Sequence, residues 1–253
     1  MDRSAYGQLA EIEKTHWWFV HRRELIAHLL ERSGWLAGDM GLDIGCGTGG
    51  NFPFLRNYCG KICGIDLSQY AIALARKNHP THTFLQADIN ELRSLYKPDS
   101  FDLVSDFSVL CHEWIESDLQ SMRDVHHVLR PGGVFIVTEP AFPALRRAHD
   151  RIGQSARRYT LSQLSFLLET AGFRCIHGTY FNAAALPVTL ALAIADRLCL
   201  PSVEQNDGIS ELKLPPNWLN NILIGVSTVE LAAIRRFRRM PFGVSIACVA
   251  RKI

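Results

Sequence analysis

Short apolar runs alternate with longer amphipathic stretches along the first two thirds of the chain. The short runs predict β-strands at Met40–Ile44, Lys61–Asp66, Thr83–Gln86, Phe101–Ser105 and Val134–Thr138. The longer stretches carry apolar residues three and four positions apart, which predicts helices at Arg22–Arg32, Ser68–Asn78 and Asp118–Leu129. Because strand and helix alternate at this spacing, we expect right-handed βαβ units on a parallel sheet, an α/β fold with helices on both faces.

The last third of the chain departs from this alternation. Two further strands are predicted at Phe173–Tyr180 and Gly243–Arg251, and two apolar helical stretches, Ala183–Leu198 and Leu219–Arg236, lie between them. A polar loop that contains prolines and a glycine joins the two stretches. The pair is too small to bury a core of its own, so we interpret it as a helical insertion before the last strand of the sheet.

The composition is that of an ordinary globular protein. Of the 253 residues, 47% are hydrophobic and 21% are charged, which excludes a disordered chain. The 27 Lys and Arg residues nearly balance the 25 Asp and Glu residues, whereas a nucleic-acid-binding protein usually concentrates basic charge. We therefore expect no nucleic-acid partner.

Cysteine spacing and apolar run length indicate the compartment. The seven cysteines form no C-x-x-C pair and no zinc-type spacing, and the charged N-terminus lacks the apolar core of a secretory signal. We expect no metal, reduced thiols and a cytoplasmic location. The longest apolar run, at 183–195, is shorter than the roughly 20 residues that a membrane-spanning helix needs, which predicts a soluble chain.

A glycine-rich turn directly after the first strand is the strongest chemical signal in the sequence. It spans 43–49 and reads D-I-G-C-G-T-G; glycines at these positions allow a positive φ and a close approach of the backbone to a ligand. Asp66 closes the second strand, where a carboxylate can accept hydrogen bonds from two ribose hydroxyls. Asp88 closes the third strand and can reach an adenine amino group. Because parallel strands open their ligand site at their carboxyl ends, this arrangement predicts an adenosyl pocket.

A dinucleotide is the competing ligand for a turn of this kind. Its fingerprint is G-x-G-x-x-G, in which the third glycine lets the helix pack on the strand. Here the spacing is G-x-G-x-G-G, with Thr48 where the helix should begin, and no basic residue inside the turn meets a phosphate. The sequence therefore favours an adenosyl ligand over a dinucleotide.

The combination of motifs resembles the class I S-adenosylmethionine-dependent methyltransferases. The similarity covers about Leu36 to Phe173 and includes the glycine turn, Asp66, Asp88-Ile89 and the L-R-P-G-G phrase at 129–133. The resemblance implies a Rossmann-like, mostly parallel sheet of seven strands whose final hairpin is antiparallel. It also implies S-adenosyl-L-methionine as the cofactor, with Asp66 on the ribose, Asp88 on the adenine amino group and the turn on the methionine portion. The cofactor-binding candidates are Asp43, Gly45, Cys46, Gly47, Gly49, Asp66, Leu67, Asp88, Ile89 and Phe107.

Two flanking phrases resemble a bacterial small-molecule subgroup of this family. They are H-W-W-F at 16–19, followed by Arg22 and Arg23, and R-R-Y-T at 157–160. The histidine expected just before the second phrase is absent, because 154–156 read Q-S-A. The resemblance therefore implies a small-molecule methyl acceptor without identifying it.

His112 is the candidate base for methyl transfer. Transfer from a sulfonium depends mostly on alignment and desolvation, and a hydroxyl acceptor must also lose its proton. His112 follows the fourth strand, whose carboxyl end faces the sulfonium in the family that the chain resembles, and the adjacent Glu113 can orient it. The alternative is a histidine that simply begins the next helix and meets solvent.

Two groups of side chains are candidate contacts for the methyl acceptor. Trp17 and Trp18 would form a lid over the cofactor, or else the apolar side of a helix docked on the sheet, and we favour the lid. Arg157 and Arg158 suit an anionic group that they would bind bidentately, and Tyr159 adds a hydroxyl donor. A solvated pair of arginines at the start of a helix is the alternative.

These inferences divide the chain into an N-terminal helical lid (1–35), a cofactor-binding core (36–180), a helical insertion that covers the substrate (181–240) and the last strand (241–253). We expect methyl transfer from S-adenosylmethionine to an oxygen or nitrogen of a small molecule, with anionic and lipid-linked acceptors among the candidates. A catalytically silent protein that binds the cofactor as a sensor or partner subunit is the alternative.

Four arginines at 235–239 follow the apolar stretch Ile222–Ile234. A basic end on an apolar helix is typical of a weak contact with an anionic membrane surface. It is also typical of a helix C-terminus whose cations satisfy the helix dipole, and we favour this second interpretation.

Overall fold

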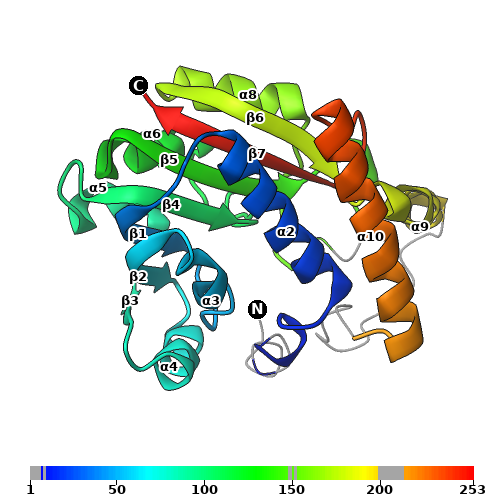
Figure 1. The fold of residues 1–253 in the computed structure, drawn as a ribbon, viewed down its shortest axis with the longest axis horizontal. Helices are drawn as coiled ribbons and strands as arrows, with labels where there is room; N and C mark the ends of the chain where they lie inside the picture. Colours follow the sequence, from blue (N-terminus) through cyan, green and yellow to red (C-terminus); the bar gives the residue numbers. More distant parts are fainter. Residues whose placement is uncertain (1–6, 8–9, 148–149, 151–152, 199–213) are drawn as a thin grey trace.

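Seven strands form one sheet in the computed structural model (Figure 1), which describes residue 7 and residues 10–147, 150, 153–198 and 214–253. The strands are β1 (Gly38–Ile44), β2 (Cys59–Asp66), β3 (Thr83–Gln86), β4 (Phe101–Phe107), β5 (Leu129–Pro140), β6 (Phe173–Phe181) and β7 (Ser245–Lys252). Their order across the sheet is β3-β2-β1-β4-β5-β7-β6. β7 runs antiparallel to both of its neighbours, and the other neighbouring strands pair in parallel. The predicted Rossmann-like sheet with an antiparallel final hairpin is therefore confirmed.

The strand order reverses between β1 and β4. The chain leaves β1 toward β3 at one edge and then returns to form β4 on the other side of β1. In open α/β sheets, ligands bind outside the carboxyl ends of the strands at such a reversal. The turns that follow β1 and β4 are therefore the expected location of the site.

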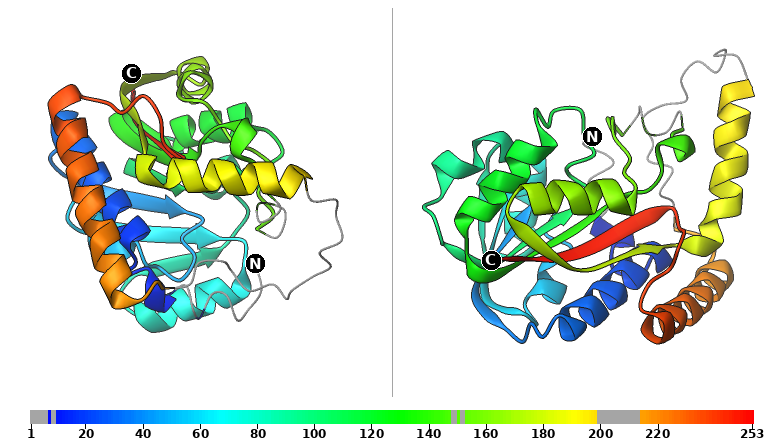
Figure 2. Two further views of the ribbon diagram at one scale, coloured as in Figure 1. Left: turned by 90° about the vertical axis from the view of Figure 1, so that its right-hand side faces the viewer. Right: turned by 90° about the horizontal axis from the view of Figure 1, so that it is seen from above.

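Helices cover both faces of the sheet (Figures 1 and 2). They are α2 (Trp17–Arg32), α3 (Phe52–Leu55), α4 (Gln69–Asn78), α5 (Leu92–Leu95), α6 (Asp118–Val128), α8 (Leu161–Thr170), α9 (Leu186–Leu198) and α10 (Asn217–Phe237), with short 3-10 turns η1 (Ile89–Glu91), η2 (Pro143–Leu145) and η3 (Ala183–Ala185). α2, α3, α4 and α10 bury apolar side chains against one face, and α5, α6 and α8 against the other. β5 supplies both cores, because Val134 and Ile136 point to the first face and Phe135 and Val137 to the second.

Two elements begin five residues before their predicted positions, a larger difference than at any other boundary. α2 begins at Trp17 and not at Arg22, because the His16 side chain accepts the Trp18 N–H at 3.2 Å and caps the helix five residues earlier. β5 begins at Leu129, which pairs with Phe101, so the R-P-G-G phrase lies inside the strand at a register shift. Thr160 and Gln163 bond reciprocally at the start of α8 and so form a capping box.

The insertion between β6 and β7 consists of η3, α9 and α10. α10 lies alongside α2 (Figure 1), whereas α9 extends away from the sheet (Figure 2). Glu230 of α10 accepts the N–H groups of Asn182 and Ala183, at 2.6 and 2.8 Å, and lies 3.1 Å from His21 Nε2 of α2. One buried carboxylate therefore joins the start of the insertion to both helices. Most of the predicted polar loop, at 199–213, lies outside the described residues.

Candidate active site

Positive backbone φ angles shape the turn between β1 and α3. Gly45, Gly47 and Gly49 have φ angles of 63°, 54° and 83°, a region that residues with a Cβ rarely adopt. A Cβ on Gly45 would lie 2.2 Å from Val109 Cγ2, so the segment after β4 packs directly on this glycine. A Cβ on Gly47 would meet no atom within 4 Å. The backbone at Gly47 therefore faces open space that a ligand can enter.

Asp66 ties the end of β2 to the glycine turn. Its Oδ2 accepts the N–H of Gly47 at 2.9 Å, and its Oδ1 accepts the N–H of Ser68 at 2.8 Å. Burial raises the pKa of Asp66, and these two backbone donors oppose the rise. Each carboxylate oxygen keeps a further lone pair, so the anchored carboxylate can still accept two hydroxyl donors. The side chain of the adjacent Leu67 is 48% exposed.

Asp88 stands between β3 and η1, and its carboxylate is held by the next turn of chain. Its Oδ1 accepts both the N–H and the side-chain amide of Asn90 at 2.9 Å. Asn90 also donates to the carbonyl of Trp114 at 2.9 Å, which joins the end of β3 to the segment after β4. Ile89 is buried. Because β2 and β3 are parallel neighbours, Asp66 and Asp88 follow adjacent strands at one edge of the sheet, as predicted.

Asp43 and Cys46 are both buried at the glycine turn. The Asp43 carboxyl accepts the hydroxyl of Ser105 at 2.7 Å and the amide of Asn51 at 3.5 Å. Burial raises the pKa of Asp43 to about 7. These bonds connect β4 to the residue that precedes α3, so Asp43 supports the turn; its contact with a cofactor stays a prediction.

His112 lies in the segment between β4 and α6. Its Nδ1 is 3.2 Å from the carbonyl oxygen of Gln154; this contact places a proton on Nδ1 and leaves the lone pair on Nε2. The ring stacks on Trp114 with the centroids 4.0 Å apart. Burial lowers the pKa of His112, so the neutral imidazole prevails at neutral pH. This is the protonation state that a general base requires.

His112 and the adjacent Glu113 both contact Gln154. The Glu113 carboxylate accepts the side-chain amide of Gln154 at 3.4 Å, and the Glu113 N–H donates to the Gln154 carbonyl at 3.0 Å. Adjacent side chains on a chain rarely converge, so Glu113 acts on His112 through this shared residue. The sequence offers no local signal for a contact 42 positions away.

Two buried carboxyl groups hold the backbone that leads to His112. Glu139 of β5 accepts the N–H groups of Leu110 and Cys111, each at 3.1 Å, and Asp106 of β4 accepts the N–H of Val109 at 2.9 Å. Asp106 and Glu139 also hydrogen bond to each other, and burial raises the pKa of both, that of Asp106 to about 7. A proton shared between two carboxyl groups lets both remain buried. Neither residue was predicted, because each reads as an ordinary strand position.

Residues 42–137, which contain the glycine turn, Asp66, Asp88 and His112, match the family model of a methyltransferase domain. Over this domain the chain is similar to the class I S-adenosylmethionine-dependent methyltransferases. Over 165 residues it is 29% identical to a probable S-adenosylmethionine-dependent methyltransferase of Mycolicibacterium smegmatis, a match that covers 64% of this chain and 61% of that protein.

Two further comparisons agree with this assignment. Over 110 residues the chain is 34% identical to the malonyl-(acyl-carrier protein) O-methyltransferase of Enterobacter lignolyticus, which covers 42% of each chain. A methyltransferase structure from Archaeoglobus fulgidus shares the fold with a TM-score of 0.55 at 19% identity, over 95% of this chain and 97% of that one. The matches to these two sequence relatives span less than two thirds of each relative's length.

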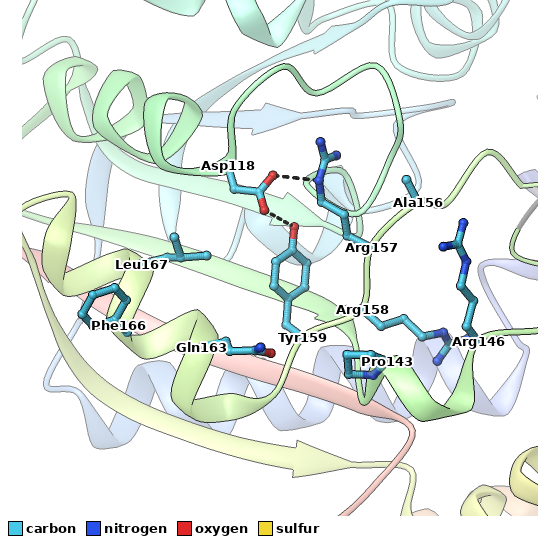
Figure 3. Close-up of a pocket in the computed structure, with 10 residues that line it drawn as sticks. All are labelled: Asp118, Pro143, Arg146, Ala156, Arg157, Arg158, Tyr159, Gln163, Phe166 and Leu167. Carbon is cyan, nitrogen blue, oxygen red and sulfur yellow. Dashed lines mark hydrogen bonds and ion pairs between the residues drawn. The ribbon is translucent and has the colours of Figure 1, made fainter.

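Arg157 and Tyr159 support the His112 segment. Arg157 donates to the carbonyl oxygens of His112 and Ile115, and its Nε lies 3.2 Å from the Asp118 carboxylate. The Tyr159 hydroxyl lies 2.9 Å from the same carboxylate. Figure 3 shows both side chains converging on Asp118. Their contact with a substrate, predicted from the sequence, stays a prediction.

Arg157, Arg158 and Tyr159 all line a surface hollow of about 430 Å³ (Figure 3). Arg158 points away from the other two residues. Its Nε and Nη2 each donate to the Asp150 carboxylate at 2.9 Å, and its Nη1 donates to the Ala141 carbonyl at 3.1 Å. Arg158 therefore makes a bidentate contact with Asp150 within the protein, and its contact with a substrate anion stays a prediction. The exposed Arg146 also lines the hollow.

Trp17 and Trp18 form the first turn of α2, and their role as a lid stays a prediction. The Trp17 N–H donates to Asn220 Oδ1 of α10 at 3.0 Å, and the Trp18 ring meets Phe19 edge-on at 4.8 Å. The aromatic residues therefore lie where α2 meets α10.

Phe107 ends β4, and the guanidinium of Arg22 lies 4.5 Å from its ring centroid. Arg22 Nη2 donates to Asn51 at 3.0 Å, which brings the arginine to the glycine turn. In the sequence Arg22 served as the start of a predicted helix and as part of the phrase that follows H-W-W-F, without a predicted contact. Its position shortly after three aromatic residues is the sequence signal that could have identified it, because an arginine near aromatic side chains often forms cation–π interactions with them.

Within the described ranges, no three His, Cys, Asp or Glu side chains are grouped so that they could hold a metal ion. In the same part of the chain, no helix combines the length and the apolar character needed to cross a membrane.

Proposed function

We propose that this chain transfers a methyl group from S-adenosylmethionine to an oxygen or nitrogen atom of a small molecule. The placement of His112 carries the proposal. Its segment packs on the glycine turn through Val109, and the contact of Nδ1 with Gln154 leaves a lone pair on Nε2. A candidate base is thus held beside a candidate cofactor turn.

The glycine turn, Asp66 and Asp88 are the residues that would hold the cofactor. The uncovered backbone at Gly47 and the doubly anchored Asp66 carboxylate fit an adenosyl group with an amino-acid tail. When bound, S-adenosylmethionine supplies an electrophilic methyl group on a sulfonium. The protein contributes alignment and the exclusion of water.

His112 removes the proton that the acceptor must lose. A hydroxyl gives its proton to Nε2 as the oxygen attacks, and an ammonium must lose a proton before its nitrogen can attack. Because burial lowers the pKa of His112, the imidazolium formed in this way returns its proton readily to solvent. The stack on Trp114 and the contact with Gln154 keep the ring in place throughout.

S-adenosylmethionine and its product S-adenosylhomocysteine should bind and stabilise the fold, whereas NAD should not. At a ligand concentration one hundred times Kd, the free energy of unfolding should rise by about 2.7 kcal/mol. Titration calorimetry and thermal unfolding check this expectation. Binding of NAD without S-adenosylmethionine would refute the cofactor proposal. Cofactor binding without methyl transfer to any member of a hydroxyl and amine panel would favour the silent alternative.

The first turn of α2 and helix α9 are proposed to cover the acceptor site. Within α9 only Ala193 is buried, and Val188 and Leu198 are 63% and 78% exposed. Apolar side chains of this kind suit the wall of a pocket, and loosely packed elements are the ones that open and close. Hydrogen exchange at 17–19 and 186–198 should slow when cofactor and acceptor bind. Unchanged exchange in both segments would make them static parts of the scaffold.

An anionic or lipid-linked acceptor is proposed from the outer face of α10. Trp218, Ile222 and Val229 lie on one side of the helix and are 66%, 55% and 71% exposed, and the exposed arginines at 235–239 follow. An apolar stripe with a basic end favours an anionic lipid surface. In the same exchange experiment, phosphatidylglycerol vesicles should protect α10 and phosphatidylcholine vesicles should not. Equal exchange with both would leave the arginines as cations at a helix end.

A further inference from the structure

A buried arginine lies against the glycine turn. Arg22 is 4% exposed, and its Nη2 donates to Asn51, which follows the turn. Its guanidinium lies 4.9, 5.2 and 4.5 Å from the ring centroids of Trp18, Phe19 and Phe107. The Nε atom is buried and has no hydrogen-bond acceptor among the described residues. A buried charged donor that lacks an acceptor is costly, so this atom points to a partner that binds here.

Glu13 places an acid on the same side of the turn. A Cβ on Gly50 would lie 1.8 Å from Glu13 Oε2, so the carboxylate presses on the turn itself. This oxygen is also buried and makes no hydrogen bond of ordinary geometry within the described residues. Burial raises the pKa of Glu13 to about 6, the charge of Arg22 is the largest effect that opposes the rise, and the Thr48 hydroxyl is near enough to the carboxyl to lower the pKa as well. A cation and an anion, each with an unsatisfied atom, therefore border one glycine turn.

Neighbouring charged residues do not supply the missing partners. The two oxygens of the Asp43 carboxylate accept hydrogen bonds from Ser105 and Asn51. Arg23 donates to the carbonyl oxygens of Glu13 and Lys14, at 2.8 and 3.1 Å, and so holds the backbone that carries Glu13. Arg22 Nε and Glu13 Oε2 therefore stay available to a ligand that carries one negative and one positive group.

The amino-acid end of S-adenosylmethionine is such a ligand, because it carries an α-carboxylate and an α-ammonium. We propose that Arg22 binds this carboxylate and that Glu13 binds this ammonium. The inference rests on the cofactor assignment above and adds the residues that recognise the end of the cofactor remote from its adenine. A planar guanidinium held by three aromatic rings is preorganised for a carboxylate, and a buried site strengthens both ion pairs.

Three ligands allow the Arg22–carboxylate contact and the Glu13–ammonium contact to be tested independently. S-adenosylhomocysteine has both charged groups, decarboxylated S-adenosylmethionine keeps only the α-ammonium, and 5′-methylthioadenosine lacks the amino-acid end. By calorimetry on the full chain, Arg22→Gln should weaken S-adenosylhomocysteine roughly ten- to hundredfold. It should leave the affinities of the other two ligands within about twofold. Glu13→Gln should weaken both ligands that carry the ammonium and leave 5′-methylthioadenosine unchanged.

Arg32→Gln is the matched control, because Arg32 lies at the far end of α2 and donates to the carbonyl of Arg238. It should leave all three affinities unchanged. Arg22→Lys keeps the positive charge but lacks the two parallel N–H donors of a guanidinium. Its loss of affinity should again be confined to S-adenosylhomocysteine. If Arg22→Gln does not fold, this variant tests whether Arg22 binds the carboxylate.

An equal loss for S-adenosylhomocysteine and 5′-methylthioadenosine would show that Arg22 only shapes the turn through Asn51. No loss in Arg22→Gln would also overturn the proposal. A wild-type chain that binds none of the three ligands would instead contradict the proposed function.

Discussion

Replacement of His112 by glutamine should lower kcat by about a hundredfold or more when the acceptor is a hydroxyl, the usual loss for a general base. Glutamine can keep the contact with the Gln154 carbonyl through its amide, but it has no basic nitrogen to accept the proton. Because His112 is predicted to touch the acceptor and not the cofactor, the Kd of S-adenosylhomocysteine should stay within about twofold of the wild-type value.

Steady-state kinetics and calorimetry on one preparation measure both quantities. His127→Gln is the matched control, since this histidine lies in the last turn of α6, where its carbonyl accepts the Asp99 N–H near the start of β4. The wild-type rate should rise with pH to a plateau, and the midpoint of the rise should lie below the ordinary histidine value of about 6.5, because burial lowers the pKa of His112. Equal turnover in His112→Gln and wild type would place His112 among the structural residues.

The sheet could be predicted because its strands carry local signals. β1 to β4 are short apolar runs, and the first three end at, or within two residues of, a glycine or an aspartate. Where prediction failed, a specific contact set the boundary, distant in one case and local in the other. β5 starts at Leu129 because Phe101 pairs with it, and α2 starts at Trp17 because His16 caps it.

The positions of site residues were predictable where the order of strands along the chain determines them. Asp66 and Asp88 close neighbouring parallel strands, so their position at one sheet edge follows from the order of elements. The supports of His112 did not follow in this way. Gln154, Glu139 and Arg157 reach its segment from positions 27 to 45 residues further along the chain. Such contacts depend on tertiary packing, which hydrophobic periodicity does not encode.

Asp66→Ala should weaken cofactor binding by roughly 1.5–3 kcal/mol, the range for hydrogen bonds to a charged group, or about ten- to a hundredfold in Kd. The carboxylate is proposed to accept the ribose hydroxyls, and it also holds the Gly47 N–H. Alanine removes both effects, so affinity alone does not separate them. Calorimetry with S-adenosylhomocysteine and its 2′,3′-dideoxy derivative does, because only the first carries the hydroxyls.

For wild type, removal of the two hydroxyls should cost no more than the mutation does, since the mutation removes the proposed ribose bonds and also the anchor on the Gly47 N–H. For Asp66→Ala, the two ligands should then bind equally, which is the signature of direct contact in a double-mutant cycle. Asp39→Ala serves as the control, because this exposed aspartate lies near the amino end of β1, away from the glycine turn. If Asp66→Ala still prefers the hydroxylated ligand by the wild-type factor, Asp66 serves only to anchor the turn, and the ribose contact must be sought elsewhere.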